Sequence, residues 1–430
     1  MLRASRLRNT RSMWLMSLLA GVVAIALVSF GPLREQLQYA TAKAAIADRD
    51  WPRAIKILER LQQKTGPTAR QQFLLGCVHR RQGEFRDGET CFERAESLGW
   101  EKVEIRRQRL LTVAQAGDIK DVEQELIRLL DSGGDDLLAE EIYEAMAKGY
   151  LNSFRMPDAD RCLKFWADWQ KNNPVQHFLK GTLEERFERP AAALKEYTAA
   201  IAIAPDLFEP MARIAQLELD TALLQNASES FLRCRVMRPD DGDSAIGLAV
   251  CRSRTGQRQE AKSLFYESLS LELIPEKASV VFSELGQLML EDGEAEKSVW
   301  LFAKSVELDP KNSRSRFGFA AALSRIGKTE EAKQEQLVGQ HLGEQQRKLI
   351  NITRQAIGEP ENPQLRVEAG KILMEQGFGS EGVRWLETAL QIEKGHQECR
   401  RLLADYYEGL GKIDRASEHR SWIKEQQITQ

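Results

Sequence analysis

Two stretches of the sequence decide the fold. Residues 181–205 read GTLEERFERPAAALKEYTAAIAIAP, and residues 215–239 read AQLELDTALLQNASESFLRCRVMRP. Each begins with a small residue, has an alanine twelve positions later and an aromatic residue sixteen positions later, and ends in proline. Apolar residues recur every three or four positions between these markers, which is typical of amphipathic helices. The two stretches therefore predict a repeated pair of helices.

The pattern returns at regular steps of 34, 34 and 37 residues. It is carried by one series of small residues (Gly181, Ala215, Ala249 and Gly286), a second small series (Ala193, Ala227, Ala261 and Ser298) and an aromatic series (Tyr197, Phe231, Phe265 and Phe302). Prolines close three units at Pro205, Pro239 and Pro310, and the remaining one has a late proline at Pro275. Self-similarity at such a period indicates a solenoid of stacked repeats.

This pattern resembles the tetratricopeptide repeat (TPR) family, whose 34-residue unit pairs two antiparallel helices. Weaker units continue it in both directions, with markers such as Ala42, Gly76, Leu110 and Ala147 upstream and Ala320, Gly370 and Ala404 downstream. The resemblance covers Gln36 to Lys424. It implies an all-α fold, a right-handed α-solenoid of about 11 TPR helical hairpins. Within each hairpin, the small residues would let the helices approach and the aromatic ring would fill the gap between them.

An apolar segment precedes the repeats. Residues 13–33, MWLMSLLAGVVAIALVSFGPL, contain no charge and as a helix would span about 31 Å, which matches a bilayer core. Residues 1–12 carry four arginines and no acid, so the positive-inside rule predicts a cytoplasmic N-terminus, a transmembrane signal anchor at 13–33 and a repeat body on the periplasmic or luminal side. A cleaved signal peptide is the alternative, but Val28-Ser29-Phe30 is a poor cleavage site.

The repeat body is expected to have three parts. A TPR solenoid of about nine units occupies residues 36–346, a helical connector occupies 347–362, and further TPR units occupy 363–425. Residues 347–362 fit no repeat and read as an elongated helix ending before Pro360. Val122 replaces a small residue, and Gln336 and Arg420 replace the aromatic, so those hairpins are expected to pack differently.

Composition and motifs argue against several functions. The net charge of −3 includes the four N-terminal arginines, so residues 34–430 carry −7, which disfavours nucleic-acid binding. The five histidines are scattered and the six cysteines form no CxxC pair, so we expect neither metal nor cofactor. Ile326-Gly327-Lys328-Thr329 lacks the first glycine of a phosphate loop and is expected to be a helix turn, with Thr329 as N-cap. The cysteines are expected to be mostly small buried hydrophobes, although disulfides stay open. We predict no enzymatic activity.

The resemblance also implies a binding surface, because first helices line the groove of a TPR superhelix. Transferred to this chain, the groove positions are Arg70, Phe73, Cys77, Arg80, Arg81 and Arg107 in the early units and Phe178, Thr182, Glu185, Arg186, Ala212 and Gln216 in the central units. The early set is basic. We expect it to bind an acidic segment or a C-terminal carboxylate of a protein partner, since arginine pairs bidentately with carboxylates.

Two functions follow from these expectations. The first is a membrane-anchored scaffold that binds protein or peptide partners in envelope assembly, secretion or complex maturation. The second is a regulatory or accessory subunit of a membrane-associated enzyme complex, with the repeats facing the cytoplasm. Both functions permit self-association, through the N-terminal helix or the last repeat.

Overall fold

A computed structural model of the chain describes residues 34–133 and 136–428. The predicted cytoplasmic segment 1–12 and the predicted anchor 13–33 lie outside these ranges. Throughout 34–133 and 136–428 the regular secondary structure is helical, without a strand, as the sequence predicts. Two compact units divide between Ala116 and Gly117.

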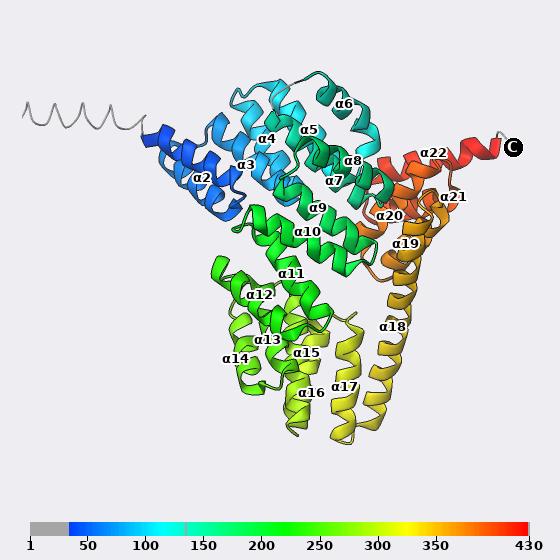
Figure 1. Ribbon diagram of the computed structural model, residues 1–430. Coiled ribbons are helices and arrows are strands. Elements are labelled where there is room, and N and C mark those ends of the chain that lie inside the picture. Colours follow the sequence, from blue (N-terminus) through cyan, green and yellow to red (C-terminus); the bar gives the residue numbers. More distant parts are fainter. Residues whose placement is uncertain (1–33, 134–135, 429–430) are drawn as a thin grey trace, which may run out of the picture. The chain divides into compact units, whose positions relative to one another are not determined.

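Short helices follow one another through both units (Figure 1). The first unit contains a helix over residues 34–47 and then α2 (Trp51–Thr65), α3 (Ala69–Gln82), α4 (Phe85–Ser97) and α5 (Lys102–Ala116). The second unit contains α6 (Ile119–Asp131), α7 (Asp136–Asn152), α8 (Met156–Trp169), α9 (Pro174–Arg186), α10 (Pro190–Ile203), α11 (Phe208–Asp220), α12 (Leu224–Met237), α13 (Gly242–Arg254), α14 (Arg258–Ser268), α15 (Pro275–Glu291), α16 (Ala295–Leu308), α17 (Ser313–Arg325), α18 (Thr329–Gly358), α19 (Pro363–Glu375), α20 (Gly379–Ile392), α21 (Gln397–Gly409) and α22 (Ile413–Ile428).

The helices pair as hairpins in the predicted register. Helices α9, α11 and α13 begin at residues 174, 208 and 242, which are 34 residues apart, and pack against α10, α12 and α14. The extra residues before the next unit lengthen its first helix, α15, to 17 residues. Pro275 therefore starts α15 and does not close the preceding helix, which ends at Ser268, because proline is tolerated in a first helical turn.

Contact between a small residue and a ring holds each hairpin together. A Cβ atom added to Gly181 would lie 2.5 Å from the Tyr197 ring, and one added to Gly76 would lie 2.5 Å from the Phe92 ring. Such distances are far below van der Waals contact, so only glycine permits the observed packing at these two positions. The rings are almost completely buried, in agreement with the predicted role of the aromatic series.

The turn inside each hairpin requires a left-handed backbone. The same turn position is glycine in most hairpins, including Gly83, Gly256, Gly327 and Gly377, all with φ between 76° and 86°. Glycine adopts this conformation without the cost that a Cβ imposes. Four hairpins place another residue there: Arg49 (φ 58°), Phe154 (φ 56°), Glu188 (φ 57°) and Ala222 (φ 60°).

Side-chain caps favour the first helices. Asn173, Asp241, Asn312 and Asn362 each accept a backbone N–H at the start of α9, α13, α17 and α19. The second helices α10, α12, α14, α16, α18 and α20 begin without a side-chain cap. The predicted N-cap at Thr329 is wrong: Lys328 is the N-cap of α18, because the Gly327 turn places Thr329 inside the helix.

Helix α18 has 30 residues, about twice the length of most of the other helices. The segment 347–362, for which we predicted an elongated helix, continues the second helix of the preceding hairpin without a break as far as Gly358. The helices after it, α19 to α22, belong to the same compact unit as α6 to α18.

The six cysteines are all buried as free thiols, which confirms their prediction as small core residues. Burial raises the pKa of Cys162 and that of Cys399 to about 12. Over residues 34–133 and 136–428, no helix combines the length and the apolarity needed to cross a bilayer.

The glycine–ring contact gives a direct test of the fold. We expect Gly181→Ala to lower the thermal stability of the full chain, because overpacking costs about 1–3 kcal/mol and exceeds the about 1 kcal/mol that alanine gains in helix propensity. Gly343→Ala is the matched control, since an added Cβ there meets nothing within 4 Å. Circular dichroism melting should show a lower Tm for Gly181→Ala and an equal or higher Tm for Gly343→Ala. Equal behaviour of the two variants would contradict the packing argument.

Candidate protein-binding surface

Two predicted groove arginines in the first unit are only half-buried. Arg70 lies on α3 with its guanidinium 4.3 Å from the centre of the Tyr39 ring, and Arg107 lies on the neighbouring helix α5. Neither arginine forms an ion pair with a carboxylate in the described part of the chain. Arg70 and Arg107 therefore keep a positive charge that a partner could neutralise.

Two other predicted groove residues are buried. Arg80 is 2 % exposed; its Nε donates to Gln108 at 2.8 Å and its Nη1 donates to Gln115 at 3.2 Å. Cys77 packs in a small core cluster that includes Phe92 and Ile105. Both side chains therefore contribute to the interior of the unit and not to an exposed surface.

Aromatic contacts hold the remaining early positions. The Phe73 ring stacks on Trp100 with centroids 4.7 Å apart. The Arg81 guanidinium lies 6.0 Å from the centre of the Trp51 ring. The basic patch expected from the sequence is thus limited to Arg70, Arg107 and Arg81, and Arg81 already contacts the Trp51 ring.

The central predicted positions form an internal network. Glu185 accepts a hydrogen bond from the Tyr197 hydroxyl at 2.5 Å and from Arg213 Nε at 3.0 Å. The Thr182 hydroxyl lies 3.3 Å from the same Tyr197 hydroxyl. Burial lowers the pKa of Arg213, but Glu185 and Tyr197 together raise it further, so the net shift is upward. Glu185 and Thr182 therefore hold the hairpin ring in place.

The other central positions make different kinds of contact. Phe178 packs beside Tyr197 with ring centroids 5.8 Å apart, and Ala212 packs against a neighbouring core cluster. Gln216 donates to Asp220 on its own helix at 2.8 Å. Arg186 reaches toward the α7–α8 turn, where its guanidinium lies 5.6 Å from the centre of the Phe154 ring.

A contact between distant repeats was not predicted from the sequence. Phe154, in the α7–α8 turn, stacks on Trp385 of α20 with ring centroids 4.1 Å apart, and it packs against a core cluster formed by α18, α19 and α20. The Arg366 Nη2 on α19 lies 3.4 Å from the Phe154 carbonyl, and Arg354 of α18 pairs with Glu188 at 2.8 Å. The later repeats of this unit therefore fold back onto its early repeats.

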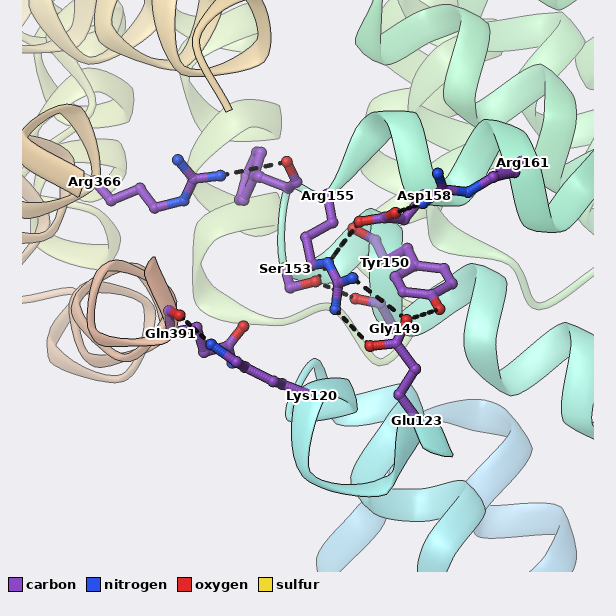
Figure 2. A network of polar contacts seen from close by, with 11 residues as sticks. Lys120, Glu123, Gly149, Tyr150, Ser153, Arg155, Asp158, Arg161, Arg366 and Gln391 are labelled. Atoms are coloured by element: carbon purple, nitrogen blue, oxygen red, sulfur yellow. Dashed lines mark hydrogen bonds and ion pairs between the residues drawn. The ribbon is translucent and has the colours of Figure 1, made fainter. Parts of the chain in front are cut away.

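A network of polar contacts lies beside the α7–α8 turn (Figure 2). Arg155 donates from Nε to Asp158 at 2.7 Å and from Nη1 to Glu123 at 3.2 Å, and Glu123 also accepts from the Tyr150 hydroxyl at 2.6 Å. Burial, reinforced by Glu123, raises the pKa of Tyr150. Lys120 of α6 donates to the Gln391 carbonyl at the end of α20.

Two cavities border this region. One of about 500 Å³ lies among α6, the α7–α8 turn, α8, α19 and α20, and a smaller one of about 280 Å³ includes Phe154, Arg186 and Trp385. Repeat spacing gives no signal for either cavity, because it records neighbouring hairpins only. The available signal was an aromatic residue at a turn position that is otherwise mostly glycine. The described residues contain no group of three or more His, Cys, Asp or Glu that could hold a metal ion.

Together, these elements define an all-helical repeat protein over the described residues. Residues 301–334, from α16 to the start of α18, match a tetratricopeptide repeat model. This match supports the repeat resemblance drawn from the sequence. Protein FlbA of Caulobacter vibrioides is 29 % identical over 142 residues, which cover 33 % of this chain and 23 % of that protein. The chain thus spans less than a quarter of the length of this relative.

Several solved structures are similar to parts of the chain. The Cut9–Hcn1 hetero-tetramer of the APC/C shows 14 % identity over 90 % of this chain and 80 % of its own, with a TM-score of 0.38. PilF of Pseudomonas aeruginosa shows 15 % identity over 54 % and 97 %, with a TM-score of 0.37. MamA of Desulfovibrio magneticus RS-1 shows 16 % identity over 40 % and 96 %, with a TM-score of 0.35. At these TM-scores we transfer no function from them.

The contact between distant repeats can be tested with a double-mutant cycle. We expect Phe154→Ala and Trp385→Ala each to lower stability, and the pair to show a coupling free energy of about 0.5–1.5 kcal/mol, as aromatic pairs do. Alanine keeps a Cβ at the left-handed position 154, so backbone strain cancels in the cycle. Denaturant unfolding measures the free energy of unfolding of the parent, the two single variants and the double variant. As a control, Trp300→Ala, at an exposed position, should combine additively with Phe154→Ala. Strict additivity of the 154/385 pair would contradict the contact.

Proposed function

We propose that this protein is a membrane-anchored TPR scaffold that binds an acidic segment or a free C-terminus of a protein partner through its first repeats. The observation that supports this proposal is the state of Arg70 and Arg107. They lie on contacting helices, α3 and α5, are partly exposed, and have no carboxylate partner among the described residues. A partner carboxylate would supply the missing charge through a bidentate pair.

The proposal includes no catalytic step, cofactor or nucleic acid. The protein acts by bringing partners together at the membrane in envelope assembly, secretion or complex maturation. The anchor at 13–33 and the exported position of the repeats rest on the uncharged stretch and on the four arginines before it.

Charge reversal tests the binding proposal. We expect Arg70→Glu combined with Arg107→Glu to weaken binding of a fluorescent peptide with an acidic, free C-terminus by at least about tenfold, because two attractive charges become repulsive. Fluorescence anisotropy with the full chain in detergent measures the change.

Arg233→Glu is the matched control, since Arg233 is an exposed arginine on α12, outside the proposed surface. The double variant should melt cooperatively and within a few degrees of the parent, because its main loss inside the protein is the cation–π contact of Arg70 with Tyr39. Unchanged peptide affinity in the folded double variant would rule out this surface.

A reporter fusion tests the topology. Alkaline phosphatase joined after Gln430 is expected to be active, and green fluorescent protein joined there is expected to be dark, because the repeats would lie across the membrane from the cytoplasm. Bright cytosolic fluorescence with an inactive phosphatase would reverse the topology and favour an accessory subunit that faces the cytoplasm.

A further inference from the structure

Three arginines occupy the same place in successive first helices. Arg316, Arg366 and Arg400 are the fourth residues of α17, α19 and α21. Each follows a tight turn that ends the preceding hairpin. Equivalent positions in a repeat protein share backbone geometry, so equal side chains there are expected to make equal contacts.

Two of the three arginines make the same contact with the preceding turn. Arg400 donates from Nε and Nη2 to the carbonyl of Lys394, six residues earlier, at 2.9 and 2.8 Å. Arg316 donates from the same two nitrogens to the carbonyl of Pro310, also six residues earlier, at 3.1 and 3.0 Å. The Nε–Nη2 edge of the guanidinium is therefore satisfied by the turn.

Arg366 breaks this pattern. It is 1 % exposed, yet it makes only two long contacts, from Nη1 to the Asn362 carbonyl at 3.5 Å and from Nη2 to the Phe154 carbonyl at 3.4 Å. Its Nε has no hydrogen-bond partner, and its guanidinium forms no ion pair, within residues 34–133 and 136–428. A buried guanidinium without a counter-charge is costly. Burial accordingly lowers the pKa of Arg366.

The poorly satisfied arginine lines the cavity of about 500 Å³ (Figure 2). Three more cations border this cavity: Lys120, Arg155 and Arg161. Two of its three carboxylates, Glu123 and Asp158, are already bound by Arg155 and Arg161. The third, Glu361, is exposed; its charge raises the pKa of Arg366 by less than burial lowers it, and the two residues form no ion pair among the described residues. Four cations and three carboxylates leave one positive charge.

We propose that this cavity is a binding site for a carboxylate ligand, held by the guanidinium of Arg366. A single carboxylate would balance the one excess charge, whereas a doubly charged phosphate would overcompensate it beside Glu123 and Asp158. Lys120 lies on the opposite wall, with its ammonium group at the Gln391 carbonyl. The ligand bridges α19 and the α7–α8 turn, so its binding stabilises the contact between distant repeats. The site belongs to the second compact unit and is independent of the function proposed for Arg70 and Arg107.

Thermal melting of the full chain in detergent tests the site. The probes are sodium acetate, the peptide N-acetyl-Ala-Ala-Ala with a free carboxylate, the amide of that peptide and inorganic phosphate, each compared with sodium chloride at equal ionic strength. We expect a carboxylate to raise the Tm of the parent protein, and the amide to have no effect. A response to acetate identifies a small organic acid as sufficient, and a response to the peptide alone identifies a chain end.

Arg366→Met and Arg400→Met form the matched pair of variants. Without ligand, Arg366→Met should leave Tm unchanged or raise it, because it removes a buried unpaired charge, while Arg400→Met should lower it by removing a satisfied one. The Tm rise caused by the carboxylate should vanish in Arg366→Met and persist in Arg400→Met.

Arg366→Lys retains the charge without the planar fork, and isothermal titration should show at least about tenfold weaker carboxylate binding than in the parent. The proposal is overturned if no carboxylate changes Tm, if phosphate acts and carboxylates do not, or if Arg366→Met keeps the full carboxylate response.

Discussion

The close approach of two helices at a small residue, glycine or alanine, is the contact on which the repeats depend. At Gly181 and Gly76 there is no room for a Cβ, because the ring of Tyr197 or Phe92 occupies that space. A helix pair at this separation buries the ring completely, and complete burial of an aromatic side chain is among the largest single contributions to a small hydrophobic core. No hairpin has a large core of its own, so the ring must work together with the next unit. The stability of each hairpin therefore depends on its packing against the hairpins next to it.

The same repetition makes exceptions informative. A left-handed turn is needed in every hairpin, and glycine provides it at almost no conformational cost. Phe154 adopts φ 56° in that position, which costs about 1–2 kcal/mol for a residue with a Cβ. Its ring contacts both Trp385 and the Arg186 guanidinium, and its carbonyl lies 3.4 Å from Arg366 Nη2. The stacking of the Phe154 ring on Trp385 in a distant repeat offsets this backbone strain.

Most of the fold could be predicted from the sequence, because repeat spacing reports contacts between neighbours. The 34-residue steps located α9, α11 and α13, and the aromatic series located the rings that fill the hairpins. The candidate surface was less predictable. Arg80 and Arg70 both lie on α3. Repeat spacing does not reveal that Gln108 and Gln115 of α5 bury Arg80 while Arg70 stays partly exposed. The contact between Phe154 and Trp385 joins residues separated by several repeats, for which spacing carries no information.

Buried arginines show how one residue type acquires different roles in one fold. Arg80 is satisfied by two glutamine side chains, and Arg400 is satisfied by a turn carbonyl and stacks 4.5 Å from the centre of the Trp422 ring. In both cases the desolvation of the guanidinium is compensated within the unit. Arg366 occupies the same position in its repeat as Arg400 but faces the contact between distant repeats. A cavity lies there, and Arg366 Nε has no turn carbonyl as acceptor. When the solenoid folds back on itself, helices that are not neighbouring hairpins come together and enclose a polar cavity, because their side chains do not interdigitate as those of adjacent hairpins do.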